Sequence, residues 1–219
     1  MDLSLATIVL WAVPVVFAIT LHEAAHGYIA MLLGDRTAYM LGRVTLNPLK
    51  HIDPIGTIAV PGFLIAVSVL TRAPLFIFGW AKPVPVNFEA LRNPKRDMFW
   101  VAGAGPTANF MMAVAWAFLL KATMPGSAFA SDGMLEMSEA GVQVNLMLMA
   151  LNLLPILPLD GGRIVVSLLP RNLANGYARL EPYGFMVVVA LLATGLLERL
   201  MDPLIRAVMT FIATIFGLL

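Results

Sequence analysis

The stretch that decides the fold is LSLATIVLWAVPVVFAITLHEAAHGYIAMLL, residues 3–33. It carries no charge from Leu3 to Leu21, then contains two histidines and one glutamate, and is apolar again as far as Leu33. A helix needs about 20 apolar residues to cross the hydrocarbon core of a bilayer. Residues 3–33 are therefore predicted to form a membrane-spanning helix that holds ionisable side chains.

The whole sequence has the composition of a membrane protein. Of its 219 residues, 60% are hydrophobic and 12% are charged, and the mean hydropathy is +0.86. A soluble domain is about 45–50% apolar and about 25% charged, so this composition excludes a soluble globular protein and a disordered chain. The net charge of +1 gives no electrostatic reason to expect nucleic acid as a partner. The absence of cysteine excludes disulfides and thiolate metal sites, so a transition-metal site must use histidine and carboxylate.

Five further apolar runs follow, separated by short polar connections: 54–71, 98–120, 140–159, 182–197 and 203–219. We predict one all-α polytopic membrane domain over residues 1–219 with about five to six transmembrane helices. Its core is expected in about residues 1–170, and further helices in about 180–219.

Two of the polar connections have distinctive sequences. Residues 37–47, TAYMLGRVTLN, have β-forming residues around a Gly-Arg pair and predict a short β-hairpin. Residues 81–87, AKPVPVN, are expected to be extended because prolines at positions 83 and 85 forbid a helix.

Residues 22–26, His-Glu-Ala-Ala-His, place reactive groups inside the first helix. Positions i and i+4 lie on one face of a helix, so His22 and His26 can share a zinc ion, with Glu23 beside them as a base. The alternative is two interfacial histidines and a glutamate that reaches toward water. Ionisable groups inside a membrane helix each cost about 2.5 kcal/mol or more, which favours the functional interpretation.

A catalytic zinc ion has three protein ligands and one open position. His51 is the only other histidine, and its polar loop is typical of a surface residue. We therefore expect a carboxylate as third ligand, and Asp160 is the only one within residues 140–180. Prolines before it break the helix, and two glycines after it allow close backbone approach. The alternative is an interfacial Asp160 that caps a helix of residues 163–169.

Three motifs resemble those of the site-2 protease family of intramembrane zinc metalloproteases: HEAAH at 22–26, AGPTAN at 104–109 and NLLPILPLDGG at 152–162. In addition, residues 78–87, FGWAKPVPVN, resemble the short bacterial and archaeal branch that has no PDZ or CBS domain. The likeness covers roughly residues 15–165.

The resemblance implies one Zn²⁺ ion held by His22, His26 and Asp160, with Glu23 as the catalytic base. It also implies that Asn109 and Asn152 position the substrate or its oxyanion. The residues alone leave both asparagines equally open to a structural role, because a membrane asparagine often hydrogen-bonds a neighbouring helix. Asn145, which no motif supports, is interpreted as such a structural link.

The expected function is that of a zinc endopeptidase which hydrolyses peptide bonds in or near transmembrane segments of substrate proteins. Its expected partners are transmembrane proteins and the lipid bilayer, and no oligomeric state is predicted. The alternative is a membrane metal transporter or sensor with the same ligands, which needs no general base. A second enzymatic alternative is a membrane protease that cuts outside the bilayer.

The motifs also predict a topology. His26 and Asp160 must reach one depth, so residues 54–81 are expected to enter the membrane and return on the same side, as a re-entrant segment. Residues 34–97 contain eight Lys and Arg residues, which the positive-inside rule places in the cytoplasm. We therefore expect an active site near the cytoplasmic face of a bacterial or archaeal cell membrane, with the N-terminus outside.

Overall fold

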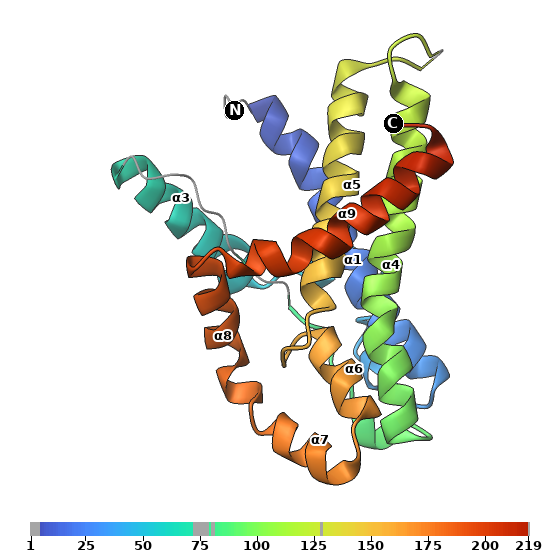
Figure 1. Cartoon of the computed structure of the whole chain (residues 1–219), viewed down its shortest axis with the longest axis vertical. Helices are drawn as coiled ribbons and strands as arrows, with labels where there is room; N and C mark the ends of the chain where they lie inside the picture. Colours follow the sequence, from blue (N-terminus) through green and yellow to red (C-terminus); the bar gives the residue numbers. More distant parts are fainter. Residues whose placement is uncertain (1–4, 72–78, 80–81, 128, 219) are drawn as a thin grey trace.

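The computed structural model describes residues 5–71, 79, 82–127 and 129–218, and these residues form helices and irregular connections but no strand. The helices are α1 (Leu5–Leu32), α2 (Thr37–Met40), α3 (Val60–Thr71), α4 (Pro94–Thr123), α5 (Asp132–Asn152), α6 (Asp160–Leu168), α7 (Arg171–Ala178), α8 (Glu181–Ala193) and α9 (Leu196–Phe216). Three short helical segments, η1 (Pro48–Lys50), η2 (Pro54–Ala59) and η3 (Phe88–Ala90), lie in the connections, and η2 leads directly into α3. Helices α1, α4 and α5 pack pairwise and form the centre of the molecule (Figure 1).

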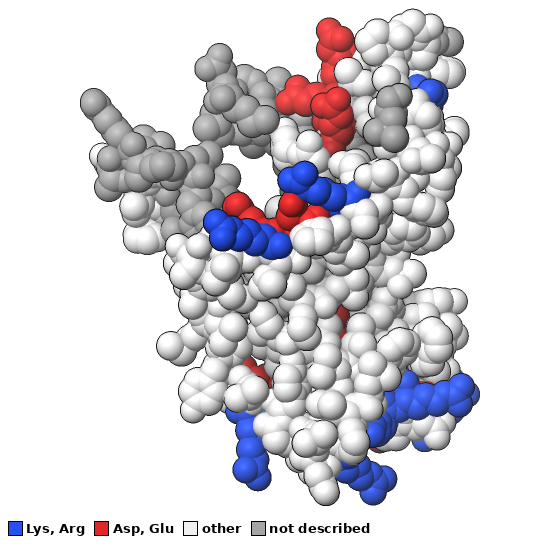
Figure 2. Space-filling model, in the orientation of Figure 1, with Lys and Arg blue, Asp and Glu red and all other residues white. Residues whose placement is uncertain are grey.

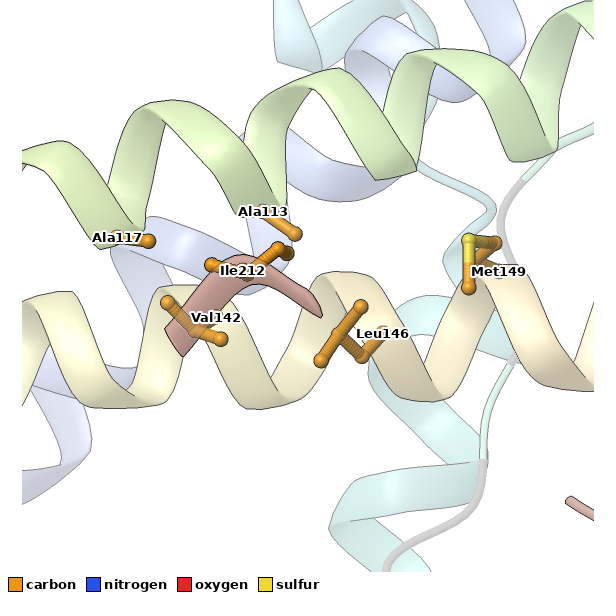
Figure 3. Packing of buried hydrophobic residues seen from close by; sticks show 6 residues of the cluster. All are labelled: Ala113, Ala117, Val142, Leu146, Met149 and Ile212. Carbon is orange, nitrogen blue, oxygen red and sulfur yellow. The ribbon is translucent and has the colours of Figure 1, made fainter. Parts of the chain in front are cut away.

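The largest hydrophobic cluster joins α4, α5 and α9 (Figure 3). Small residues of α4 face larger ones of the other two helices, and the six buried members are Ala113, Ala117, Val142, Leu146, Met149 and Ile212. Alanine side chains let helix backbones approach closely, which is how helices gain packing energy in a membrane. This cluster holds α4 and α5 in a fixed register, and both helices contribute to the site described below.

The predicted count of five to six transmembrane helices is wrong. Among the described residues, only Val9–Leu32 and Pro94–Thr123 are long and apolar enough to cross a membrane, or three spans if α8 and α9 form one span bent by 86°. The reason is that the other helices are too short or carry too many charged side chains. Helix α5 begins with three carboxylates in eight residues, α8 has 13 residues, and α9 carries four charged side chains.

The predicted β-hairpin over residues 37–47 is also wrong. Thr37–Met40 form the short helix α2, and Gly42 has a positive φ of 63°. The N–H of Arg43 donates to the carbonyl of Ala38, and that of Gly42 donates to Tyr39. These two bonds with a left-handed glycine are the Schellman pattern that ends a helix. Gly42 therefore ends a helix instead of forming a hairpin turn.

The predicted re-entrant segment is described in part. Residues 54–71 form η2 and α3, and the 12 residues of α3 correspond to about 18 Å of helix, too short to cross a bilayer core. The expected returning path falls mostly on 72–78 and 80–81, which lie outside the described residues. Residues 82–87 contain no helix, as their prolines require.

Candidate metal centre and adjoining cavity

Helix α1 directs its two histidines into the protein. His22 and His26 are 6% and 9% exposed, and their Nε2 atoms lie 3.0 Å apart. The ring centroids are 4.7 Å apart, with the ring planes nearly perpendicular. The predicted i, i+4 pair therefore shares one buried face of the helix.

Asp160 joins this pair from a distant part of the chain. It is the first residue of α6, and its Oδ2 atom lies 3.3 Å from the Nε2 atom of His22 and 3.3 Å from that of His26. These three residues form a group whose ligand atoms all lie within 4.8 Å of one another. The three predicted metal ligands are thus brought together by the fold.

The donor set fits a zinc ion. Tetrahedral ligands at about 2.0–2.1 Å from zinc lie roughly 3.3–3.4 Å from one another, which agrees with the 3.0 and 3.3 Å separations of the three ligand atoms. Oδ2 of Asp160 is buried without a well-formed hydrogen bond. Aspartate binds a metal ion as its carboxylate, so an ion bound here would give this buried oxygen a partner.

The other nitrogen of each imidazole contacts α4. Nδ1 of His22 lies 2.6 Å from Oδ1 of Asn109, and Nδ1 of His26 lies 2.7 Å from the carbonyl oxygen of Val101. A carbonyl oxygen is an acceptor, so both Nδ1 atoms donate and both Nε2 atoms keep a free lone pair. Such outer hydrogen bonds fix the tautomer and orientation of metal-binding histidines.

Asn109 is fully buried and uses both ends of its amide. Its Nδ2 donates to the carbonyl of Ala18 at 3.2 Å and to Oδ1 of Asn145 at 3.0 Å. Asn145, also fully buried, donates in turn to Gly141 of its own helix. Asn109 therefore links α1, α4 and α5 and contacts a histidine directly. This geometry favours a role in orienting His22 over the predicted contact with substrate.

Helix α4 comes closest to the histidines at Gly105. A Cβ atom at this position would lie 2.6 Å from Nε2 of His22 and would overlap Nε2 of His26. The space beside the ligand atoms therefore exists only because residue 105 has no side chain. The close approach of α4 to α1 at this glycine therefore borders the metal centre.

Glu23 is held by a backbone group from a connection. Its Oε2 accepts a hydrogen bond of 2.7 Å from the N–H of Val84. Proline occupies both neighbouring positions, so Val84 has the only backbone N–H in residues 83–85. Apart from that pair of prolines, no feature of the sequence marks this contact.

Two buried side chains hold the segment around Val84. Arg43, 8% exposed, donates to the carbonyl of Lys82 at 2.8 Å. The N–H of Lys82 donates to the carbonyl of His51, and Nε2 of His51 bonds the carbonyl of Thr45 at 3.1 Å. The prediction that His51 is a surface residue is wrong, since only 2% of it is exposed. It supports the segment that contacts Glu23.

A cavity of about 640 Å³ adjoins this centre. His22, Glu23 and Asn152 contribute polar groups to a wall that is otherwise mostly apolar and comes from α1, α5, α8 and the loop before α6. Nδ2 of Asn152 donates to the carbonyl of Leu148 in its own helix. Of the two predicted asparagines, Asn152 therefore faces the cavity and Asn109 lies behind the histidines.

The sequence is similar to known proteins. Residues 120–195 match peptidase family M50. YwhC of Bacillus subtilis, a protein named as a zinc metalloprotease, is 38% identical over 89% of this chain and 85% of its own length. Rip2 of Mycolicibacterium smegmatis, named likewise, is 30% identical over 83% of this chain and 66% of its own length. No solved structure matches the chain.

The fold groups His22, His26 and Asp160, and Glu23 lines the adjoining cavity together with His22. The first of these relatives covers most of both chains. The chain belongs to peptidase family M50, the site-2 type of zinc metalloprotease.

Proposed function

We propose that this protein is an intramembrane endopeptidase that hydrolyses peptide bonds in or near transmembrane segments of other proteins. The observation that carries the proposal is the position of the metal centre. His22, which forms the centre with His26 and Asp160, lines a mostly apolar cavity together with Glu23. A substrate helix that has unwound locally is apolar, so this cavity matches its side chains while the polar groups of the wall receive its backbone.

The roles of the residues follow from their contacts. The two histidines and Asp160 would hold a zinc ion, which would supply Lewis acidity to lower the pKa of water and to polarise a peptide carbonyl. Glu23 accepts a proton from the attacking water and delivers it to the leaving amine. Asn152 lies across the same cavity and binds the peptide backbone.

Residues 82–87 are the described segment best placed to meet an unwound substrate, because they border Glu23. An extended peptide pairs with another backbone through N–H and carbonyl groups. Here two prolines lack an N–H, and the N–H of Val84 is bonded to Glu23. Pairing of a substrate through the N–H of Val84 therefore competes with the hydrogen bond from this N–H to Glu23.

We also propose that the metal centre lies nearer the cytoplasmic face. The N–H of Arg92 donates to the carbonyl of Leu33 at 3.0 Å, so the end of α1 and the start of α4 lie side by side. Residues 34–97 run between these two helix ends and contain the eight cationic residues. The chain has no cysteine, so single cysteines introduced at Thr45, Asn93 and Ser131 can be labelled without background. The first two are expected to react from the cytoplasmic side and the third from outside, and labelling of the first two from opposite sides would contradict the proposal.

The function is tested with pure protein in liposomes and a tagged model transmembrane substrate. Glu23→Gln is expected to keep near-stoichiometric zinc and to lose essentially all cleavage, because the base is removed and the ligands remain. Normal turnover by this variant would refute the mechanism. Equal cleavage of the same peptide in soluble form would show that the enzyme cuts outside the bilayer. Zinc transport without cleavage by the wild type would instead identify a transporter.

A further inference from the structure

A cavity of about 600 Å³ lies between the first turn of α4 and the helices α6 and α7, away from the metal centre. Figure 1 shows these three elements together at the lower end of the molecule, and Figure 2 shows Lys and Arg side chains gathered at that end. Three cationic side chains, Lys95, Arg96 and Arg171, line the cavity. No carboxylate is among the described residues that line it.

These cations have no acidic partner in the described part of the chain. Lys95, Arg96 and Arg171 make no ion pair there, whereas Arg163 pairs with Glu181 at 2.8 Å. The acid next in sequence, Asp97, is buried and accepts a hydrogen bond from the backbone of Asn93. The cavity therefore presents three positive charges to an anion.

A second cavity, of about 480 Å³, continues from the first. Both cavities are lined by Lys95, Arg96 and Ser167. Of the two, the second is also lined by Phe99, Trp100 and Leu168. Trp100 and Leu168 are 57% and 67% exposed. Trp100 lies six residues, about 9 Å along the helix, beyond the start of α4. Tryptophan at this depth is typical of the boundary between lipid and water.

We propose that this end of the molecule binds an anionic phospholipid. The phosphate lies among Lys95, Arg96 and Arg171, and an acyl chain follows Phe99, Trp100 and Leu168. Basic pockets between membrane helices bind lipid headgroups in this way. A free phosphate would use the cations but leave the exposed apolar groove uncovered, so the adjoining groove favours a lipid.

The bound lipid would join α4 to α6 and α7. Helix α4 supplies the groups that hold both histidines, and α6 begins with Asp160. A ligand that bridges the start of α4 and the end of α6 stabilises their relative position, since whatever binds the folded state stabilises it. The inference concerns binding and does not depend on the proposed proteolysis.

The test is lipid retention by the purified full chain, measured by native mass spectrometry with phosphatidylglycerol and phosphatidylcholine. The pocket variant replaces Lys95, Arg96 and Arg171 with glutamine. The matched control replaces Arg36, Lys50 and Arg179, three exposed cations outside both cavities, and changes the net charge equally. Each cation near a lipid phosphate contributes about fivefold in affinity, so the pocket variant should bind phosphatidylglycerol on the order of 100-fold more weakly.

The control variant is expected to bind phosphatidylglycerol within about threefold of the wild type, and the wild type should prefer this lipid to phosphatidylcholine. Equal losses in both triple variants would show general surface attraction and overturn the proposal. In a second arm, phosphatidylglycerol with brominated acyl chains should quench the fluorescence of Trp100. This quenching should be present in the wild type and absent in the Trp100→Phe variant. Binding of inorganic phosphate at the cations without such quenching would identify a soluble anion and refute the lipid.

Discussion

Asn109 provides the sharpest test of how the metal centre is built, and the perturbation is Asn109→Ala. The structure places its Oδ1 atom 2.6 Å from Nδ1 of His22, in a site with no exposure to solvent. Removal of this acceptor leaves the imidazole free to rotate and to carry its proton on Nε2, the atom that faces Asp160. Because the site is fully buried, we expect no replacement of this acceptor by bulk water.

Loss of an outer hydrogen bond of this kind typically weakens metal binding by about 10–100-fold. Because the distance is short and the site is fully buried, we expect an effect at the upper end of this range. Asn109→Ala should weaken zinc binding by about 100-fold, or 2.8 kcal/mol. Two variants separate this effect from packing. Asn109→Asp keeps an acceptor for His22 and should bind zinc within about tenfold of the wild type. Asn145→Ala removes a partner of Asn109 but leaves its bond to Ala18, and should stay within about threefold.

The assay is competition between the purified protein and a zinc chelator, followed by a zinc-sensitive dye, alongside cleavage of a model substrate. The reasoning predicts that zinc affinity and cleavage at limiting zinc fall together, and that excess zinc restores much of the cleavage. Wild-type zinc affinity combined with a collapse of turnover would refute it. That result would return Asn109 to the role in substrate positioning that the sequence motif implied.

Three further predictions concern groups around the same centre. Asp160→Ala should weaken zinc binding by orders of magnitude and Asp53→Ala should not, and the reverse order in metal analysis would move the site to the loop near residue 53. Gly105→Ala should abolish stoichiometric zinc binding because its Cβ would fill the space beside the Nε2 atoms of His22 and His26. Full zinc content would show that α4 can shift to make room for the methyl group. Arg43→Ala should keep zinc but lower kcat by about 10–100-fold, because the backbone that aligns Val84 with Glu23 loses its anchor, and unchanged kcat would contradict that role.

The grouping of His22, His26 and Asp160 was predictable because its signals are local or exclusive. His22 and His26 are one turn apart on one helix, and helix geometry alone puts them on a common face. Asp160 was found by elimination, as the one carboxylate in a long apolar stretch. The contact between Val84 and Glu23 joins backbone and side chain across 61 positions. No residue-type pattern marks a backbone N–H, so this contact required the fold.

The errors have a different physical origin. The pattern of residues 37–47 favours a strand by residue type, but Asp35 accepts a bond from the N–H of Thr37 and Gly42 ends the turn of helix. Local capping therefore overrides β propensity. His51 was judged from its polar neighbours, yet its backbone and ring both hydrogen-bond backbone groups of Lys82 and Thr45. Burial of a polar residue depends on such partners and not on the hydropathy of the surrounding sequence.

One stripe of α4 explains how two distant parts of the chain form a single centre. Val101, Gly105 and Asn109 follow one another at intervals of four residues and lie within about 80° of the helix surface. The first bonds His26, the second leaves room for both Nε2 atoms, and the third bonds His22. Further along the same helix, Ala113 and Ala117 pack in the core with α5 and α9. The packing of α4 against both α5 and α1 therefore sets where these three groups lie, and their position determines the tautomer of each histidine. A rotation of α4 by one residue, about 100°, would remove all three contacts together while changing no ligand.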